Sequence, residues 1–449
     1  MSLPQQLLLS LHGVKGFNRT TFEELHASGE KVISIRLNPM KPMNHGSWAM
    51  QNVPWCPQGQ YLSKRPSFTL DPLFHAGAYY VQEASSMFLW HALKETIGAD
   101  TQKKVLDLCA APGGKSTLLA SYFTNGLIVA NEVIKSRASV LVENITKWGT
   151  DHVIVTNNDP SHFQSLPGYF NVMVIDAPCS GSGLFRKDPA SVDEWSEDIV
   201  QLCSKRQQRI LADALPALQE DGVLIYSTCS YSPEEDEAIA DWLVAEMNME
   251  SKRIFLQDNW GIVEMQSPDK AAYGYRFYPD KIKGEGFFIA AFQKKSECKN
   301  IRLKEQVLTF PSKADIQQIN DFIGIPPDYA LFKQSNAIRA IKKNWITDLQ
   351  LLAQCLYIKK AGVEIGTIKG KDVIPSHELA LSLLPLDIMA SIELTEEQAL
   401  QYLRRKELAL DAEKGWNLVR YCGLPLGWIK VLPNRINNYY PAEWRILKE

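Results

Sequence analysis

Short apolar runs recur through the middle of the chain, and amphipathic segments of helical period lie between most of them. Each run is too short for a helix and is apolar on both faces, which is typical of strands buried inside a parallel sheet. We therefore expect five strands, at residues 105–108, 127–130, 152–156, 172–175 and 223–227. Strands that alternate with helices predict an α/β fold with a doubly wound, Rossmann-like sheet.

The same pattern also predicts three helices and the hairpin that completes the sheet. We expect helices at 116–123, 193–218 and 234–247, the last begun by Ser232 as N-cap, proline at the first position and acidic residues in the first turn. Runs 274–279 and 286–292 predict a hairpin that closes the sheet, and Arg276 in the first is a further candidate for contact with a ligand or RNA.

The pattern divides the chain into three parts. Residues 1–75 predict a small α+β segment, with a helix at 3–11 and a strand at 31–37. Residues 76–295 hold the sheet, and a linker at 294–299 leads to a β-rich accessory region at 300–449. Within that region we expect two helices, at 313–322 and 395–404, and two hairpins, at 362–371 and 423–430.

Composition is that of a globular protein of two or three domains, with 449 residues and 45% hydrophobic residues. The net charge of -3 argues against a simple electrostatic nucleic-acid binder. The charge is uneven, because residues 299–449 carry 21 Lys and Arg against 17 Asp and Glu, while residues 1–298 carry 27 against 34. A basic C-terminal region on an acidic body permits a polyanionic partner.

The cysteines indicate a reducing, cytoplasmic environment, because the chain shows no signal peptide and no CxxC pair. No Cys/His spacing suits zinc, so we expect no metal site, and no apolar run is long enough to predict a membrane span. A monomer is the default expectation. The eight cysteines are Cys56, Cys109, Cys179, Cys203, Cys229, Cys298, Cys355 and Cys422.

A loop of small residues after the first strand predicts a ligand site. It lacks the spacing of a P-loop and of GxGxxG, but its strand–loop–helix setting lets the backbone approach a nucleotide-like ligand closely. The loop consists of Cys109, Ala110, Ala111, Pro112, Gly113, Gly114 and Lys115.

Acidic residues then follow three successive strands. Glu132 comes roughly 20 residues after the loop, the spacing of an acid that holds ribose hydroxyls, and Arg137 lies in the next helix. Asp159 and Asp176 end the next two strands. Without a pyrophosphate-binding loop, this series favours S-adenosylmethionine over a dinucleotide.

Two cysteines lie just beyond strand ends that should be neighbours. Cys179 follows the strand that ends at Asp176, and Cys229 follows strand 223–227. We expect both thiols to face one pocket; the alternative is a pair of unrelated buried thiols. Arg186 and Lys187 follow the first cysteine and suit a phosphate-bearing partner or could favour a thiolate.

These motifs resemble the Sun/NSUN family of RNA cytosine-C5 methyltransferases. The resemblance covers roughly residues 34–293, and the C-terminal third resembles the bacterial 16S ribosomal RNA type, in which a PUA-like RNA-binding domain follows the catalytic domain. The segments that carry it are GAYYVQEASSM (77–87), AAPGGKS (110–116), DAPCSGSG (176–183) and STCSYSPEEDE (227–237).

The resemblance implies a seven-stranded methyltransferase sheet and a role for each motif. Cys229 matches the nucleophile, and Cys179 matches the cysteine that helps to release the product. The 109–115 loop, Glu132, Asp159 and Asp176 match positions that contact S-adenosylmethionine, with Arg137 beside them, and Asp176 also lies near the target base. The implied partner is RNA, most plausibly 16S ribosomal RNA.

The chemistry explains the need for a thiol, because carbon 5 of cytosine becomes nucleophilic only after a thiolate has added to carbon 6. Three alternatives stay open at this point. They are a transfer RNA methyltransferase, a non-catalytic ribosome-assembly protein, and an exocyclic-amine methyltransferase, although the last normally uses an Asn/Asp-Pro-Pro-aromatic loop rather than DAPC.

Overall fold

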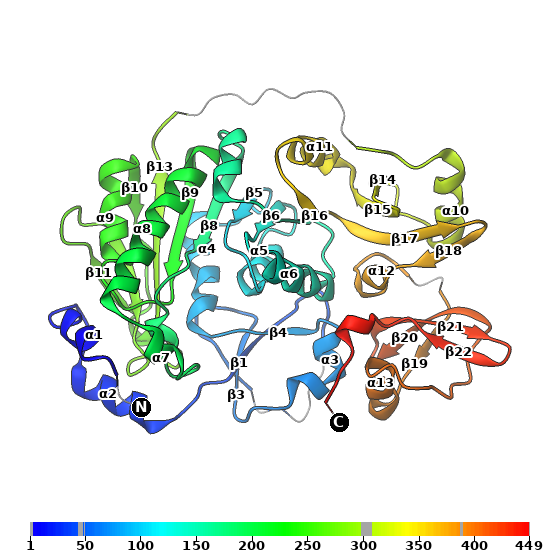
Figure 1. Ribbon diagram of the computed structural model, residues 1–449, viewed down its shortest axis with the longest axis horizontal. Coiled ribbons are helices and arrows are strands. Elements are labelled where there is room, and N and C mark those ends of the chain that lie inside the picture. The colour runs from blue at the N-terminus through cyan, green and yellow to red at the C-terminus, as the bar shows by residue number, and fades with distance from the viewer. Residues whose placement is uncertain (1–2, 44–47, 49, 298–307, 387–388, 449) are drawn as a thin grey trace.

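A mixed ten-stranded sheet forms the centre of the protein in the computed structural model, which describes residues 3–43, 48, 50–297, 308–386 and 389–448 (Figure 1). Its parallel part has the order β9-β8-β5-β6-β7, and β13 and β12 continue it antiparallel beyond β9. These are the seven predicted strands: β5 Lys104–Asp107, β6 Leu127–Asn131, β7 Val153–Thr156, β8 Phe170–Asp176, β9 Leu218–Thr228, β12 Tyr273–Phe277 and β13 Phe287–Lys294.

Three more strands widen this sheet at places that the sequence pattern did not indicate. β11 (Val263–Gln266) pairs with β12, and β10 (Met249–Lys252) pairs with β13. β16 (Ile358–Lys360) comes from the C-terminal region and lies antiparallel to β7. The C-terminal region therefore extends the central sheet through one of its own strands.

Alternate residues of the parallel strands pack into two separate cores, because successive side chains of a strand point to opposite faces of the sheet. Val105 packs on one face with α4 (Leu89–Thr96), α5 (Gly114–Tyr122) and α6 (Lys135–Trp148). Leu106 packs on the other face with α8 (Glu197–Ala214), α9 (Glu237–Glu246) and α11 (Ile346–Cys355). Burial on both faces explains why these strands are apolar throughout.

Two predicted helices have different bounds. The helix expected at 193–218 is interrupted after α7 (Ser191–Glu194), because Trp195 is extended and Ser196 caps α8 through the Ile199 N–H. The helix expected from Glu234 begins only at Glu237, so the prediction of Ser232 as its N-cap is wrong. Residues 232–236 form a turn instead, and two of their acidic side chains point into the protein.

The N-terminal segment packs against the sheet domain in two ways. Helices α1 (Gln5–Ser10) and α2 (Arg19–Ser28) bury apolar side chains against Tyr231 and Tyr278 of that domain. A four-stranded sheet follows, in the order β2-β3-β1-β4. Its strands are β1 Ser34–Leu37, β2 Met50–Asn52, β3 Gly59–Leu62 and β4 Tyr79–Val81, and the short helix α3 spans Pro72–His75.

The C-terminal region holds two further four-stranded sheets (Figure 1). The first has the order β14-β15-β17-β18, with strands Tyr329–Gln334, Ala337–Lys342, Val363–Lys369 and Asp372–Pro375. The second has the order β19-β20-β21-β22, with strands Ser391–Glu393, Gly415–Tyr421, Leu424–Leu432 and Arg435–Asn438. Residues 362–371 hold β17 and the turn of the β17–β18 hairpin, close to the expected position. The hairpin expected at 423–430 is wrong, because these residues belong to the single strand β21, which pairs with β20 before it and β22 after it.

This region contains four α-helices among its described residues rather than the two expected. α10 (Lys313–Ile323) and α13 (Glu396–Leu403) were predicted, and both carry a capping box. α11 and α12 (His377–Leu381) were missed, because α11 is apolar on most sides and α12 is barely more than one turn. Residues 298–307, which include Cys298 and the end of the expected linker, lie outside the described residues.

Lys41 ties the N-terminal segment to the rest of the protein. Its buried Nζ donates to the backbone oxygens of Ala76 (2.9 Å), Lys147 (2.7 Å) and Leu381 (2.7 Å). Lys147 lies near the end of α6 and Leu381 ends α12, so one ammonium group joins the N-terminal segment, the sheet domain and the C-terminal region.

Replacement of Lys41 by methionine should therefore loosen this junction. Methionine fills the space but leaves three buried carbonyl groups without a donor, which we expect to cost about 3 kcal/mol in the free energy of unfolding. Thermal unfolding should show a lower midpoint for Lys41→Met than for wild type. The control is Lys64→Met on the exposed surface, and equal midpoints for the two variants would contradict the assignment.

Candidate active site

A pocket of about 340 Å³ opens at the carboxyl ends of the parallel strands, where open α/β sheets hold their ligands. Eight of the predicted site residues line it: Cys109, Ala110, Ala111, Pro112, Gly114, Lys115, Asp176 and Cys229. The N-terminal stretch contributes a wall that includes Tyr80, Gln82 and Glu83, and Phe287 of β13 lies opposite. The predicted residues that do not line it are Gly113, Glu132, Arg137, Asp159 and Cys179.

The small-residue loop is held from outside by side chains of α6. Arg137 donates to the Ala111 oxygen (2.7 Å) and Asn144 donates to the Pro112 oxygen (2.8 Å). Gly113 has φ +116°, a conformation that favours glycine, and it starts α5. A Cβ atom at Gly114 would lie 3.3 Å from the ring of Tyr80, so a larger residue at this position would require that ring to shift. Arg137 thus supports the loop rather than lining the pocket.

The first two predicted acids do not line this pocket. Glu132 is buried, accepts a hydrogen bond from the Ile134 N–H and lies 3.7 Å from Arg137. Asp159 caps the 3₁₀ turn Pro160–Ser165 by accepting from the Ser161 N–H and hydroxyl, and these hydrogen bonds lower the pKa of Asp159.

Asp176 does reach the pocket. Its carboxylate forms an ion pair with Lys115 Nζ at 2.8 Å and accepts a hydrogen bond from Ser227 Oγ at 2.8 Å. Asp176 and Ser227 stand opposite each other in the β8–β9 ladder, which fixes the carboxylate at the point where both strands end. One acid and one amine therefore meet at the mouth of the pocket.

The two cysteines lie together, as the strand positions predicted. Their Sγ atoms are 3.0 Å apart, which is hydrogen-bond distance for a thiol and its partner. Contact with Cys229, followed by burial, raises the pKa of Cys179 well above its usual value. The raised pKa keeps Cys179 protonated, so its S–H can donate to the Sγ of Cys229.

This arrangement predicts unequal reactivity of the thiols. With iodoacetamide at pH 8, Cys229 should be alkylated faster than Cys203, because burial raises the pKa of Cys203 and covers it within α8. We expect a rate difference of about tenfold or more, measured by mass spectrometry of the two cysteine peptides over time. Equal rates would show that the site does not activate Cys229.

Two arginines do not have the roles considered for them. Arg186 is buried, donates to the backbone oxygens of Glu30 and Gly284, and lies 3.6 Å from Glu285, so its guanidinium is not free for phosphate. Arg276 is buried between Glu237 and Asp236 and faces neither the pocket nor solvent. Lys187 does line the pocket.

The sequence analysis missed polar residues that organise the site from behind. Asp107 is buried at the end of β5, accepts from Ser116 Oγ at 2.6 Å, and has a pKa raised to about 7 by burial. Its other oxygen has no hydrogen-bond partner among the described residues. Glu235, interpreted from the sequence only as part of a helix start, is fully buried beside both cysteine loops. Asp107 lies within a predicted strand and Glu235 within a helix-capping pattern, so the sequence gave no signal that either acid supports the site.

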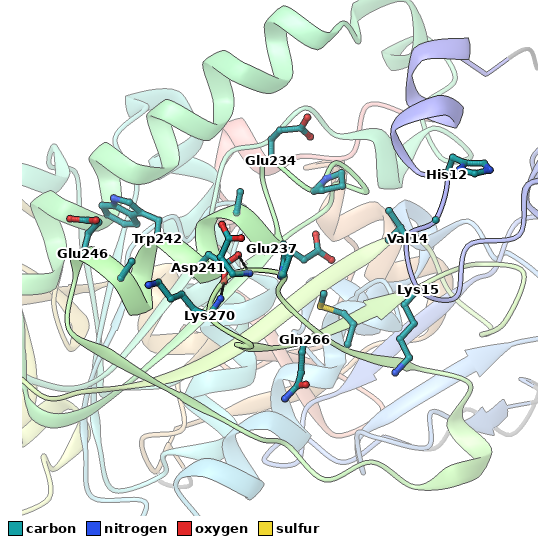
Figure 2. Close-up of a pocket in the computed structure, with 17 residues that line it drawn as sticks. His12, Val14, Lys15, Glu234, Glu237, Asp241, Trp242, Glu246, Gln266 and Lys270 are labelled. Carbon is teal, nitrogen blue, oxygen red and sulfur yellow. Dashed lines mark hydrogen bonds between the residues drawn. The ribbon is translucent and has the colours of Figure 1, made fainter.

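A larger pocket of about 840 Å³ lies elsewhere, between the 12–15 loop and α9 (Figure 2). No cysteine lines it, and its most buried acids are already occupied. Asp241 accepts from the Ser267 hydroxyl and from two backbone N–H groups, and Glu237 pairs with Arg276. The chemistry therefore belongs to the smaller pocket.

Neither a metal-binding group of side chains nor a membrane-spanning helix is found among the described residues. Among the described residues, no group of three or more His, Cys, Asp and Glu side chains is arranged to hold a metal ion. No helix in the same part of the chain is both long and apolar enough to cross a membrane.

The sheet order, the small-residue loop and the cysteine pair together define a Rossmann-like methyltransferase. Family models agree along the chain: residues 3–84 match the N-terminal domain of 16S rRNA methyltransferase RsmF, residues 96–293 match 16S rRNA methyltransferase RsmB/F, and residues 390–446 match the methyltransferase RsmF PUA domain.

Curated relatives extend this match to the whole length. Ribosomal RNA small subunit methyltransferase F of Psychromonas ingrahamii is 30% identical over 98% of this chain and 97% of its own. The protein of the same name from Vibrio cholerae is 29% identical over 99% and 98%. The chain belongs to the RsmF family of 16S ribosomal RNA methyltransferases, which confirms the resemblance and the predicted enzyme class.

Solved structures agree on the fold. A methyltransferase homolog protein from Pyrococcus horikoshii superposes with a TM-score of 0.51 at 27% identity, covering 65% of this chain and all of that one (100%). NSun6 from Pyrococcus horikoshii gives a TM-score of 0.54 at 19% identity, covering 66% and 99%, and shows the fold alone. The predicted α/β sheet domain with a β-rich PUA domain is thus confirmed.

Proposed function

We propose that the protein methylates carbon 5 of a cytosine in 16S ribosomal RNA, with S-adenosylmethionine as methyl donor and Cys229 as covalent nucleophile. The observation that carries this proposal is the pair of thiols 3.0 Å apart, of which Cys229 lines the pocket and Cys179 lies directly behind it. A methyltransferase that acts on an amine needs no such pair. A cytosine C5 enzyme needs one thiol to add and gains from a second to help release the product.

The pocket fits the proposed cofactor. Backbone and small side chains from Cys109 to Pro112 leave an open wall for an adenosine group, and polar groups of Gln82, Glu83 and Lys115 line the pocket for the amino acid part. S-adenosylmethionine would supply a methyl group on a positively charged sulfur. Glu132 and Asp159, at the ends of β6 and just beyond β7, are proposed to hold the adenosine from the side, with Arg137 fixing the loop.

The residues of the chain account for each step on the cytosine. The Cys229 thiolate forms a bond to carbon 6, and carbon 5 then takes the methyl group. Asp176, which lines the pocket, is proposed to donate a proton to the ring nitrogen as negative charge develops there. The proton of carbon 5 then passes to water, its bonding electrons form the double bond between carbons 5 and 6, and the bond between carbon 6 and sulfur breaks to return Cys229 as a thiolate. The S–H of Cys179, 3.0 Å away, is proposed to donate a hydrogen bond to this leaving sulfur.

The proposed RNA partner is supported by the outer face of the C-terminal sheet. The rings of Trp416 and Tyr439 lie 4.5 Å apart, and Lys430 lies over Trp416 at 5.2 Å. Partly exposed aromatic rings beside cations stack on unpaired bases and attract phosphates. Arg435 is exposed next to this surface. The target cytosine must itself leave its stack to reach the pocket, so we expect it in a loop or an opened helix.

A transfer assay with purified components tests the proposal. The protein is incubated with radiolabelled S-adenosylmethionine and either small ribosomal subunits, naked 16S RNA or transfer RNA, and the product is mapped by bisulfite sequencing. We expect one protected cytosine in 16S RNA. Label on an exocyclic amine, or in transfer RNA alone, would overturn the proposal, and no label at all would favour a non-catalytic assembly role. A cytoplasmic, monomeric protein stays a prediction.

A further inference from the structure

One buried carboxylate joins the loops that carry the two cysteines. Glu235 is fully buried, and its Oε1 accepts from the Ser180 N–H at 2.8 Å. Its Oε2 accepts from the Ser180 hydroxyl at 2.5 Å and from the Ser230 hydroxyl at 2.6 Å. Ser180 directly follows Cys179 and Ser230 directly follows Cys229. The same side chain is therefore hydrogen-bonded to the residue that follows each cysteine.

The strands alone do not hold these loops at the cysteines. The Ala177 N–H donates to the Ser227 oxygen, and the Gly183 N–H donates to the Cys229 oxygen. Between these two bonds the chain bends away from the ladder at Pro178, which has no N–H to donate. Glu235 supplies three contacts in this interval, at the position where the Sγ atoms must be brought together.

Glu235 is itself held firmly in place. The Tyr226 hydroxyl in β9 donates to the backbone oxygen of Glu235 at 2.7 Å. Gln207 of α8 donates to Oε1 at 3.2 Å. Glu235 is thus anchored through its backbone to a strand and through its carboxylate to a helix of the sheet domain, which makes it suitable as a fixed reference for two loops.

We propose that Glu235 is a positioning residue that sets the separation of Cys179 and Cys229. The inference rests on the proposed covalent mechanism, in which both thiols act on one base in turn. A change of about 1 Å in the position of a reacting group can lower a rate on the order of 100-fold. Glu235 touches neither wall of the pocket, so its loss acts on the chemical steps and leaves binding of cofactor and RNA intact.

The test compares Glu235→Ala with Glu234→Ala, its neighbour, which contacts neither cysteine loop through its side chain. Two measurements are made on the full-length protein. The first is steady-state methylation of 16S RNA, giving kcat and the KM values for RNA and S-adenosylmethionine. The second is the rate at which diamide links Cys179 to Cys229 in the protein alone, followed by mass spectrometry of the joined peptides. The second needs neither RNA nor methyl transfer.

Glu235→Ala should lower kcat by about 100-fold with KM values within about threefold, and slow the cross-link by about tenfold or more. Glu235→Gln keeps the length of the side chain and one acceptor oxygen, and should recover at least about tenfold in kcat over alanine. Glu234→Ala should match wild type. A cross-linking rate for Glu235→Ala equal to that of wild type, or a kcat within threefold, would overturn the inference.

Failure of the proposed function would look different. In that case wild type itself would not be captured by RNA containing 5-azacytidine, whatever the cross-linking rates. If Glu235→Ala does not fold, Ser180→Ala and Ser230→Ala remove the hydroxyl contacts to Glu235 one loop at a time, while the residue 180 N–H and Gln207 still donate to Oε1. Each should slow the cross-link relative to wild type, and an unchanged rate in both would contradict the inference.

Discussion

Replacement of Cys229 by serine should abolish methylation, with kcat reduced by about 1,000-fold or more. A serine hydroxyl is far less acidic than a thiol, so it supplies almost none of the anion that must add to carbon 6. The same variant should no longer be captured by RNA that contains 5-azacytidine, a base analogue that traps the adduct. Methylation is measured by label transfer to 16S RNA and capture by a slower band in denaturing gels.

The control for this experiment is Cys422→Ser. Cys422 is exposed in the turn between β20 and β21, far along the chain from the pocket, and its change should leave both measurements at the wild-type level. Because serine is nearly the same size as cysteine, Cys229→Ser should keep the unfolding midpoint of wild type. If Cys229→Ser retained activity within tenfold, Cys229 would not be the nucleophile.

Replacement of Cys179 by serine should have the opposite effect on the adduct. Cys229 can still add to the base and carbon 5 can still take the methyl group, but the release step loses the thiol that lies 3.0 Å from the nucleophile. We expect a stable protein–RNA adduct with ordinary 16S RNA and a fall in turnover of about 100-fold or more. A denaturing gel with labelled RNA shows the adduct directly.

A double variant separates addition from release. Cys179→Ser combined with Cys229→Ser should form no adduct, because the bond to carbon 6 cannot form. Adduct in the double variant would mean that another nucleophile is attached. Release of product by Cys179→Ser at the wild-type rate would show that Cys179 has no part in the second step, and would leave the assignment of Cys229 unchanged.

The local pattern of the sequence was sufficient for the central sheet. Strands such as 172–175 are apolar on both faces, and only burial between two helical layers accounts for that, so both position and type were correct. The same pattern could not place β16, a three-residue strand separated from β7 by about 200 residues, because pairing at such a distance depends on how the domains pack. Nor could it show the break at Trp195, where the side chain packs with α1 and overrides the helical period.

The site residues show the same division between what the sequence predicted and what tertiary packing decided. Asp176 and Cys229 were found because a strand end fixes where the next side chain must lie. Arg186 and Arg276 were interpreted from charge alone, and tertiary packing buried both against acids from other elements. Glu235 lay within an acidic run typical of a helix start, and only the turn at residues 232–236 directed its carboxylate inward.

By itself, the sequence determined the positions of the strands along the chain, the small-residue loop and the two cysteines that follow strand ends, because each depends on residues close together in the chain. Tertiary structure alone decided how far apart the thiols lie, which carboxylate joins their loops, and which cations remain free to meet a ligand. Those properties depend on contacts between residues far apart in the chain, such as Cys179 with Cys229 and Lys41 with Leu381, and no local pattern encodes a distance of that kind.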